Sequence, residues 1–208
     1  MADYYRVLPI VSRTLSHALF DSHDFISNIR YDSCAVLEAA AKLRHKTLFR
    51  DALVWAVGNW NKPDSRSLSN TRLRQVARYA YGEIAEQVAL SSSRIFIGFA
   101  AVDNDAWSDK FRDAIFEPQE NWSKLSDYLR NQGEMNFPKF FRRVLEYQGL
   151  PEDIDMDDLN IPDLLRNNLV LDRTTRLPGK DHTTDEDYFL CAEIDDEDPP
   201  WDLNETDW

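Results

Sequence analysis

The feature that most constrains this chain is the spacing of its apolar residues, which recur at helical intervals through most of the first 150 positions. Such spacing places apolar side chains on one side of an α-helix, so each helix can bury that side against its neighbours. The clearest stripe is formed by Leu48, Phe49, Ala52, Leu53, Ala56, Val57 and Trp60. It predicts a helix over 46–59, ended by Gly58 and Asn59. We therefore expect an all-α fold, an irregular multi-helix bundle.

Similar reasoning predicts the other helices of the chain. They are expected at 9–20, 24–29, 33–43, 70–99, 105–115, 120–131 and 137–147, with one more short helix within 162–171. Gly149 suits the left-handed position that often follows a helix end, and Pro151 then stops the helix. Three consecutive serines at 91–93 leave open a break in the long helix, and 95–102 could alternatively form a buried strand.

The charge divides the chain into regions. Residues 1–150 carry 20 Lys and Arg against 18 Asp and Glu, whereas residues 151–208 carry 4 against 19, so the net charge of -13 resides in the C-terminal region. We expect a helical bundle over 1–150, a linker with a short helix over 151–177, and an acidic tail over 178–208. A polar, acidic composition with few apolar residues favours disorder or a loosely docked arm, so the tail is expected to be largely disordered.

Within the bundle, residues 42–78 form a basic sector. Nine Lys and Arg stand there against Asp51 and Asp64. This sector could bind phosphate locally or act as a weak nucleic-acid site, or it could be an ordinary solvated helix face. The strongly acidic C-terminal region would repel a nucleic-acid backbone, which makes nucleic acid an unlikely main partner.

Few residues are arranged for catalysis or for cofactor binding. No two glycines lie within 15 positions, so no phosphate-binding glycine loop is present, and no His or Cys has the short spacing of a zinc site. The alternating aspartates over 153–158 lack the glycine and the distal glutamate of a calcium loop. Cys34 is expected to be a small core residue, and His45 to lie at a helix start. We expect no catalytic residue, no metal and no cofactor.

Compartment and membrane association follow from simple observations. The longest run without a charged residue is ten residues, Ala52–Asn61, about half of what a membrane-spanning helix requires. The N-terminus lacks the pattern of a signal peptide. Two cysteines 157 positions apart do not suggest a disulfide framework. These features predict a reducing intracellular location, cytoplasmic or nuclear, without membrane association.

Several short segments resemble a known family. They are Tyr4–Ser12, Leu37–Ala40, Lys42–His45, Leu48–Leu53 and Val57–Trp60. Together they resemble the region that follows the BTB/POZ domain in fungal BTB-domain proteins, over roughly residues 3–100. The resemblance implies a helical bundle with a role like that of a BACK domain, next to a BTB domain that dimerises or recruits partners. The few residues before Tyr4 are too short to form a BTB domain, which is therefore expected to be absent here.

These observations favour a non-enzymatic adaptor or scaffold that binds one or more unidentified proteins. The residues proposed to make the contacts are Arg74, Arg78, Tyr188, Phe189, Trp201 and Trp208. Aromatic side chains would supply affinity, and the surrounding carboxylates would steer the encounter. The tail could instead be only a solvating terminus, or it could fold back and cover the basic sector 42–78. The alternatives are an enzyme with a site near His17, His45 or Cys34, and a weak nucleic-acid binder.

Overall fold

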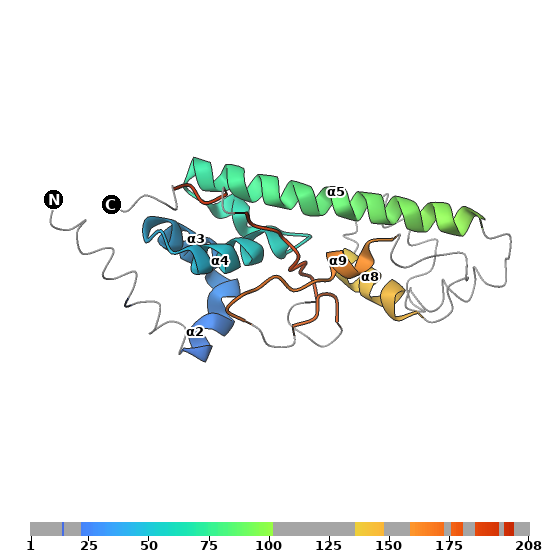
Figure 1. Ribbon diagram of the computed structural model, residues 1–208, viewed down its shortest axis with the longest axis horizontal. Helices are drawn as coiled ribbons and strands as arrows, with labels where there is room; N and C mark the ends of the chain where they lie inside the picture. The colour runs from blue at the N-terminus through green and yellow to red at the C-terminus, as the bar shows by residue number, and fades with distance from the viewer. Residues whose placement is uncertain are drawn as a thin grey trace. The chain divides into compact units, whose positions relative to one another are not determined.

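The regular secondary structure of the described residues is helical. The structure, a computed structural model, describes Thr14 and residues 22–101, 136–147, 159–172, 176–180, 186–195 and 198–201 (Figure 1). Within these ranges the chain forms α-helices, short 3-10 helices and connecting segments, and it contains no β-strand. The predicted all-α class is therefore confirmed.

The chain divides into two compact units, and their boundaries differ from the predicted ones. The first unit comprises Met1–Gly82, Asn168–Thr175 and Ala192–Trp208, and the second comprises Glu83–Asn167 and Arg176–Cys191. The expected division into 1–150, 151–177 and 178–208 followed composition along the sequence. The structure instead combines C-terminal segments with helices that are distant in the sequence, because apolar residues near the C-terminus pack into both units.

The first unit begins with four helical segments in close succession. They are α2 (His23–Asn28), η1 (Ile29–Asp32), α3 (Ser33–Lys42) and α4 (Lys46–Gly58). Their bounds agree with the predicted helices at 24–29, 33–43 and 46–59. The turn between α3 and α4 contains Arg44 in the left-handed conformation, with φ of 49°. His45 starts α4 as predicted, and its Nδ1 accepts a hydrogen bond from the N–H of Leu48 at 3.2 Å.

Helix α4 is the central element of the first unit. Ten of its thirteen residues are buried, among them Phe49, Leu53 and Trp55. Helix α3 packs beside α4 and buries Leu37 and Ala40 completely (Figure 1). A helix that is apolar on nearly all sides is stable only in the interior of a fold, which explains why α4 is surrounded.

Helix α5 (Thr71–Ala101) contributes residues to both units. It continues without a break through the three serines, so neither the possible break nor the alternative strand over 95–102 is found. The reason is that Ser91 takes a buried position in a regular stripe with Ile84, Val88 and Ile95. A small side chain suits that position, and the helical repeat is preserved.

The second unit contains α8 (Phe137–Glu146) and α9 (Ile161–Leu164). Asn136 caps α8 by accepting a hydrogen bond from the N–H of Lys139 at 3.0 Å. The predicted helix at 137–147 is confirmed, whereas the helix expected within 162–171 is only a single turn. The helices predicted at 105–115 and 120–131, and the helix end at Gly149, lie outside the described residues. Of the helix predicted at 9–20, only Thr14 is described, and it is helical.

The described part of the acidic C-terminal region does not follow the expected disorder. Between its carboxylates lie apolar residues that are buried, namely Phe189, Leu190, Cys191, Ala192 and Ile194. Removing such side chains from water is favourable. This gain offsets the chain entropy that is lost when the segment becomes ordered. This segment therefore belongs to the folded structure.

Candidate interaction surfaces

A group of exposed basic residues lies at the start of α5. Arg72, Arg74 and Arg78, which we call the basic face, are exposed there. The opposite side of the same turns buries Leu73 and Ala77. Because the buried side is held by packing, the arginines project from a fixed helix rather than from a mobile loop.

The start of α5 is anchored by two side chains. Asn70 accepts hydrogen bonds at its Oδ1 from the N–H groups of Arg72 and Leu73, at 2.9 and 3.3 Å. Glu38 of α3 accepts hydrogen bonds from the N–H and the hydroxyl of Ser69, both at 2.7 Å. These hydrogen bonds hold the pKa of Glu38 below its usual value. They fix the first turn of α5, and with it the position of the basic face.

The positive charge of the basic face is not neutralised within the described structure. Arg74 donates to the carbonyl of Ser69 at 3.4 Å and to the hydroxyl of Thr71 at 3.5 Å, and neither group is charged. Among the described residues, no carboxylate forms an ion pair with Arg72 or Arg78. Tyr79, on the same helix, is 65% exposed. The predicted contact residues Arg74 and Arg78 thus share one accessible surface.

The aromatic residues predicted as contacts in the C-terminal region have different environments. Phe189 is completely buried, and its ring centroid lies 6.3 Å from that of Phe141. Its assignment as a contact residue is therefore wrong, because a core side chain cannot be offered to a partner. Tyr188 is half-buried, and Trp208 lies outside the described residues.

Trp201 attaches the C-terminal region to the first unit. It is half-buried, and its ring meets that of Phe49 edge to face, with centroids 5.1 Å apart. Phe49 belongs to α4 and lies within the basic sector 42–78. Trp201 therefore contacts one residue of that sector, through its ring. The prediction that the acidic tail covers the arginines of that sector is not tested by this contact.

Asp51 is a buried carboxylate that the sequence did not single out as a candidate residue. It lies in α4, is 1% exposed, and accepts hydrogen bonds from the N–H groups of Val170 at 2.9 Å and Leu171 at 2.8 Å. Burial raises the pKa of this carboxyl, and the backbone hydrogen bonds oppose the rise. Asp51 therefore joins the segment 168–172 to α4. The available signal was a carboxylate directly before the uncharged run that begins at Ala52.

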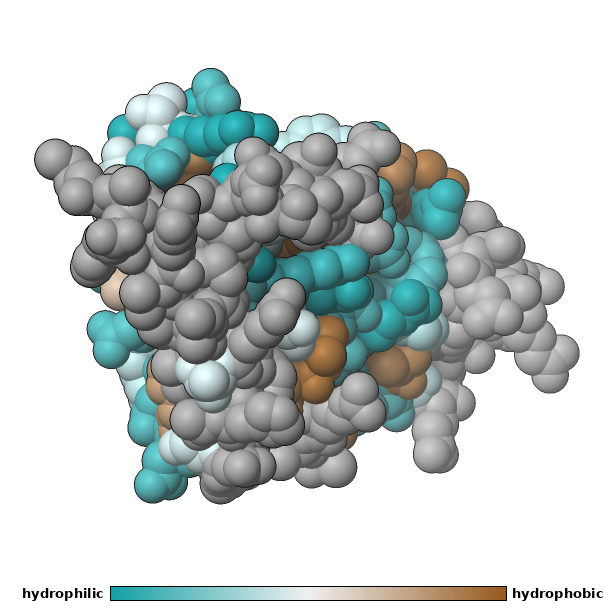
Figure 2. All heavy atoms as spheres, turned by 60° about the vertical axis from the view of Figure 1, so that its left-hand side comes forward, coloured by the Kyte–Doolittle hydropathy of each residue, from teal (hydrophilic) through white to brown (hydrophobic). Residues whose placement is uncertain are grey.

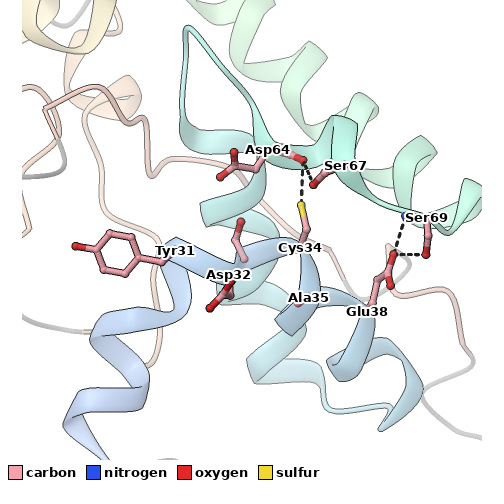
Figure 3. Close-up of a pocket in the computed structure, with 9 residues that line it drawn as sticks. Tyr31, Asp32, Cys34, Ala35, Glu38, Asp64, Ser67 and Ser69 are labelled. Atoms are coloured by element: carbon pink, nitrogen blue, oxygen red, sulfur yellow. Dashed lines mark hydrogen bonds between the residues drawn. The ribbon is translucent and has the colours of Figure 1, made fainter.

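A cavity of about 370 Å³ opens at the beginning of α3 (Figure 3). It is lined by Tyr31, Asp32, Ser33, Cys34, Ala35, Glu38, Asp64, Ser67 and Ser69. Cys34 and Ser67 both donate to the backbone carbonyl of Asp64, at 3.1 and 2.7 Å. Cys34 is half-buried, which corrects its expected place in the core: its thiol faces the 64–67 turn rather than apolar neighbours.

Cys34 and His45, two of the residues considered for catalysis, lie in surroundings that do not activate them as a nucleophile and a base. Burial, together with the nearby Asp64 carboxylate, raises the pKa of the Cys34 thiol, which favours the unreactive protonated form. Burial lowers the pKa of His45, whose Nδ1 is engaged as a helix cap. His17 lies outside the described residues. In the described ranges, no three His, Cys, Asp or Glu side chains come together in a way that could hold a metal ion.

On the face drawn in Figure 2, hydrophilic side chains cover most of the described surface, and hydrophobic ones form small separate groups. Charged and hydrogen-bonding groups are therefore the main features that a partner would meet there. None of the described helices is both long enough and apolar enough to cross a membrane.

Comparison with known proteins adds no relative. No family model, curated protein or solved structure matches the chain. The resemblance to the region after a BTB domain therefore stays a prediction, and function must be argued from the surfaces described above.

Proposed function

We propose that this protein is a non-enzymatic interaction module that binds an acidic segment of a partner protein through the basic face of α5. The observation that carries the proposal is the group of three exposed arginines on one anchored helix, of which Arg72 and Arg78 have no described carboxylate partner. The planar guanidinium group binds carboxylates in a two-pronged geometry, which suits recognition of Asp and Glu side chains.

The geometry of α5 supports this role in a second way. Arg74 and Arg78 are four residues apart, so their side chains project from neighbouring turns on one side of the helix. Tyr79 adds an exposed aromatic ring on the same helix. Arginine and tyrosine are enriched among residues that dominate binding energy, while the surrounding charges mainly raise the association rate and the specificity.

The C-terminal aromatic residues have a reduced part in this proposal. Phe189 is structural, and Trp201 contacts Phe49 in the first unit. Tyr188 is only half-buried and remains a proposed contact. We therefore propose the helix, and not the acidic tail, as the main partner-binding surface.

The test is a binding titration with a labelled ten-residue glutamate peptide and a matched glutamine peptide, followed by fluorescence anisotropy. The double variant Arg74→Glu/Arg78→Glu should weaken glutamate-peptide binding on the order of tenfold or more, and added salt should weaken binding by the native protein. Arg94→Glu is the matched control, because Arg94 is exposed on the same helix sixteen residues later. Equal binding by the native protein and the double variant would refute the proposal.

The same arginines leave a second function open, which is weak nucleic-acid binding through the sector 42–78. A single-stranded oligonucleotide, titrated in parallel, distinguishes the two. Stronger binding to the oligonucleotide than to the glutamate peptide, with a steep salt dependence, would favour this alternative.

A relationship to the region after a BTB domain is also part of the proposal. The support is the set of short segments described above and the helical fold of their described members, α3 and α4. Sequencing of the full transcript tests it. An in-frame BTB domain upstream would support the relationship directly, whereas a transcript without such a domain would remove that support and leave the interaction role standing.

A further inference from the structure

The contact between Trp201 and Phe49 joins the acidic C-terminal region to the buried helix α4. Phe49 is 0% exposed and Trp201 is half-buried, and their rings meet edge to face with centroids 5.1 Å apart. Both residues belong to the first unit. Aromatic pairs of this geometry are favourable beyond the burial of their surface. Trp201 therefore anchors the segment 198–201, which we call the arm.

The chain that leads into the arm is strongly acidic. Residues 195–198 are four consecutive carboxylates, and no Lys or Arg occurs over 181–208. The first and last of the four are joined: the N–H of Asp195 donates to the Asp198 carboxylate at 2.6 Å, and the N–H of Asp198 donates to the Asp195 carbonyl at 3.3 Å. Bringing like charges together is unfavourable, so repulsion opposes the two hydrogen bonds that close this turn.

Two prolines, Pro199 and Pro200, follow this turn directly. A proline disfavours helical backbone at the residue before it, here Asp198, and consecutive prolines favour a stiff, extended chain. An extended residue spans about 3.3 Å, so straightening the chain from Asp195 to Asp198 would separate their Cα atoms by about 10 Å. The arm would then carry Trp201 away from Phe49 of the same chain.

Opening of the turn would leave two complementary surfaces without a partner, the ring of Trp201 and its seat on Phe49. A second copy of the chain offers the same two surfaces. The contact that forms within one chain can therefore form between two, and an exchange of arms restores it in both molecules while the acidic turn is relieved. The structure thereby specifies the occupant, because the seat on Phe49 already holds this segment.

We propose that two copies of this protein associate by exchanging their arms, with residues 195–198 as the hinge and Trp201 of each copy seated on Phe49 of the other. The basic face of α5 takes no part, so the proposal does not depend on the function proposed above. Within one chain a short tether keeps the arm at an effective concentration of about millimolar, so the exchanged dimer should be populated at a protein concentration of about 1 mM.

The exchange is tested by cross-linking between isotopically distinct copies. An unlabelled chain with the photoreactive amino acid p-benzoylphenylalanine at position 201 is mixed at about 1 mM with a native chain labelled with nitrogen-15. Dimers are isolated by size-exclusion chromatography with light scattering, irradiated and mapped by mass spectrometry. The expected product joins an unlabelled arm to a labelled α4 peptide. A chain that stays monomeric, or a dimer whose arm cross-links only to unlabelled α4, would overturn the proposal.

The role of the hinge is tested by a pair of variants with equal charge. Asp195→Asn/Asp198→Asn removes two charges and keeps both hydrogen bonds of the turn, since an amide oxygen at position 198 still accepts, so the dimer fraction should fall several-fold. Glu83→Gln/Glu86→Gln is the control, because these side chains of α5 form no hydrogen bond or ion pair with the described residues. It lowers repulsion between two acidic chains equally, so its dimer fraction should not fall. An equal dimer fraction in the two variants would overturn the assignment of the hinge.

Discussion

Replacement of Phe189 by alanine is the most direct test of the described C-terminal fold. Phe189 lies in an acidic region whose composition predicts disorder, yet its side chain is 0% exposed and it packs beside Phe141 in the second unit. In the described fold, truncation removes a fully buried aromatic ring. If the region is a solvated tail, the same change should have almost no effect on stability.

The expected magnitude follows from the environment of the ring. Phe-to-Ala changes at fully buried positions cost about 3–5 kcal/mol, and an aromatic pair such as this one accounts for about 0.5–1.5 kcal/mol of that beyond simple burial. Domains of ordinary stability unfold with about 5–15 kcal/mol, so the loss is a large fraction of the total. Phe189→Leu keeps most of the apolar volume and should cost less than about 1.5 kcal/mol.

Urea unfolding followed by circular dichroism measures the loss for the whole chain. Because the chain has two compact units, the transition need not be two-state. Hydrogen exchange of α8, which carries Phe141, therefore supplies a local measurement. Tyr188→Ala, at a half-buried neighbouring position, is the matched control with a smaller expected loss. A change below about 0.5 kcal/mol for Phe189→Ala, with unaltered exchange in α8, would refute the packing described here.

Three further predictions concern single residues. Gly179→Ala should destabilise the second unit by at least about 2 kcal/mol in urea unfolding. The reason is that Gly179 has φ of 72° and an added Cβ would lie 2.0 Å from the carbonyl oxygen of Pro138. Unchanged stability would contradict this prediction. Asp51→Asn should cost about 1–3 kcal/mol at neutral pH, since an amide cannot accept both backbone hydrogen bonds. Burial raises the pKa of Asp51, so its contribution to stability is full below the unfolded pKa and is lost as the pH rises through the folded pKa. The difference between the native protein and Asp51→Asn should therefore grow as the pH is lowered from about 7 to about 4, and a shrinking difference would contradict the sign. Alkylation of Cys34 by iodoacetamide should show a midpoint pH above that of an unstructured cysteine peptide, because burial raises the pKa of the Cys34 thiol. Asp64→Asn should lower that midpoint, since the Asp64 carboxylate also raises this pKa. An unshifted midpoint would count against the described environment of the thiol.

The sequence by itself determined the helical class and most local helix bounds. The apolar spacing of 46–59, the stop at Gly58 and the start at His45 are local properties, since they depend on side chains within one or two turns. The same holds for α8, whose start is set by Asn136 and Pro138. Such signals operate over a few residues and can be read directly from the chain.

Tertiary structure alone decided which residues lie together. The carboxylate of Asp51 meets backbone groups about 120 positions later, and Trp201 meets Phe49 across some 150 positions. The cavity beside Cys34 likewise joins residues around 31–38 to residues around 64–69. No local spacing encodes these pairs, because each depends on how separate segments close on one another. For the same reason, composition marked the region of Phe189 as a tail, although burial of its few apolar side chains makes it part of the core.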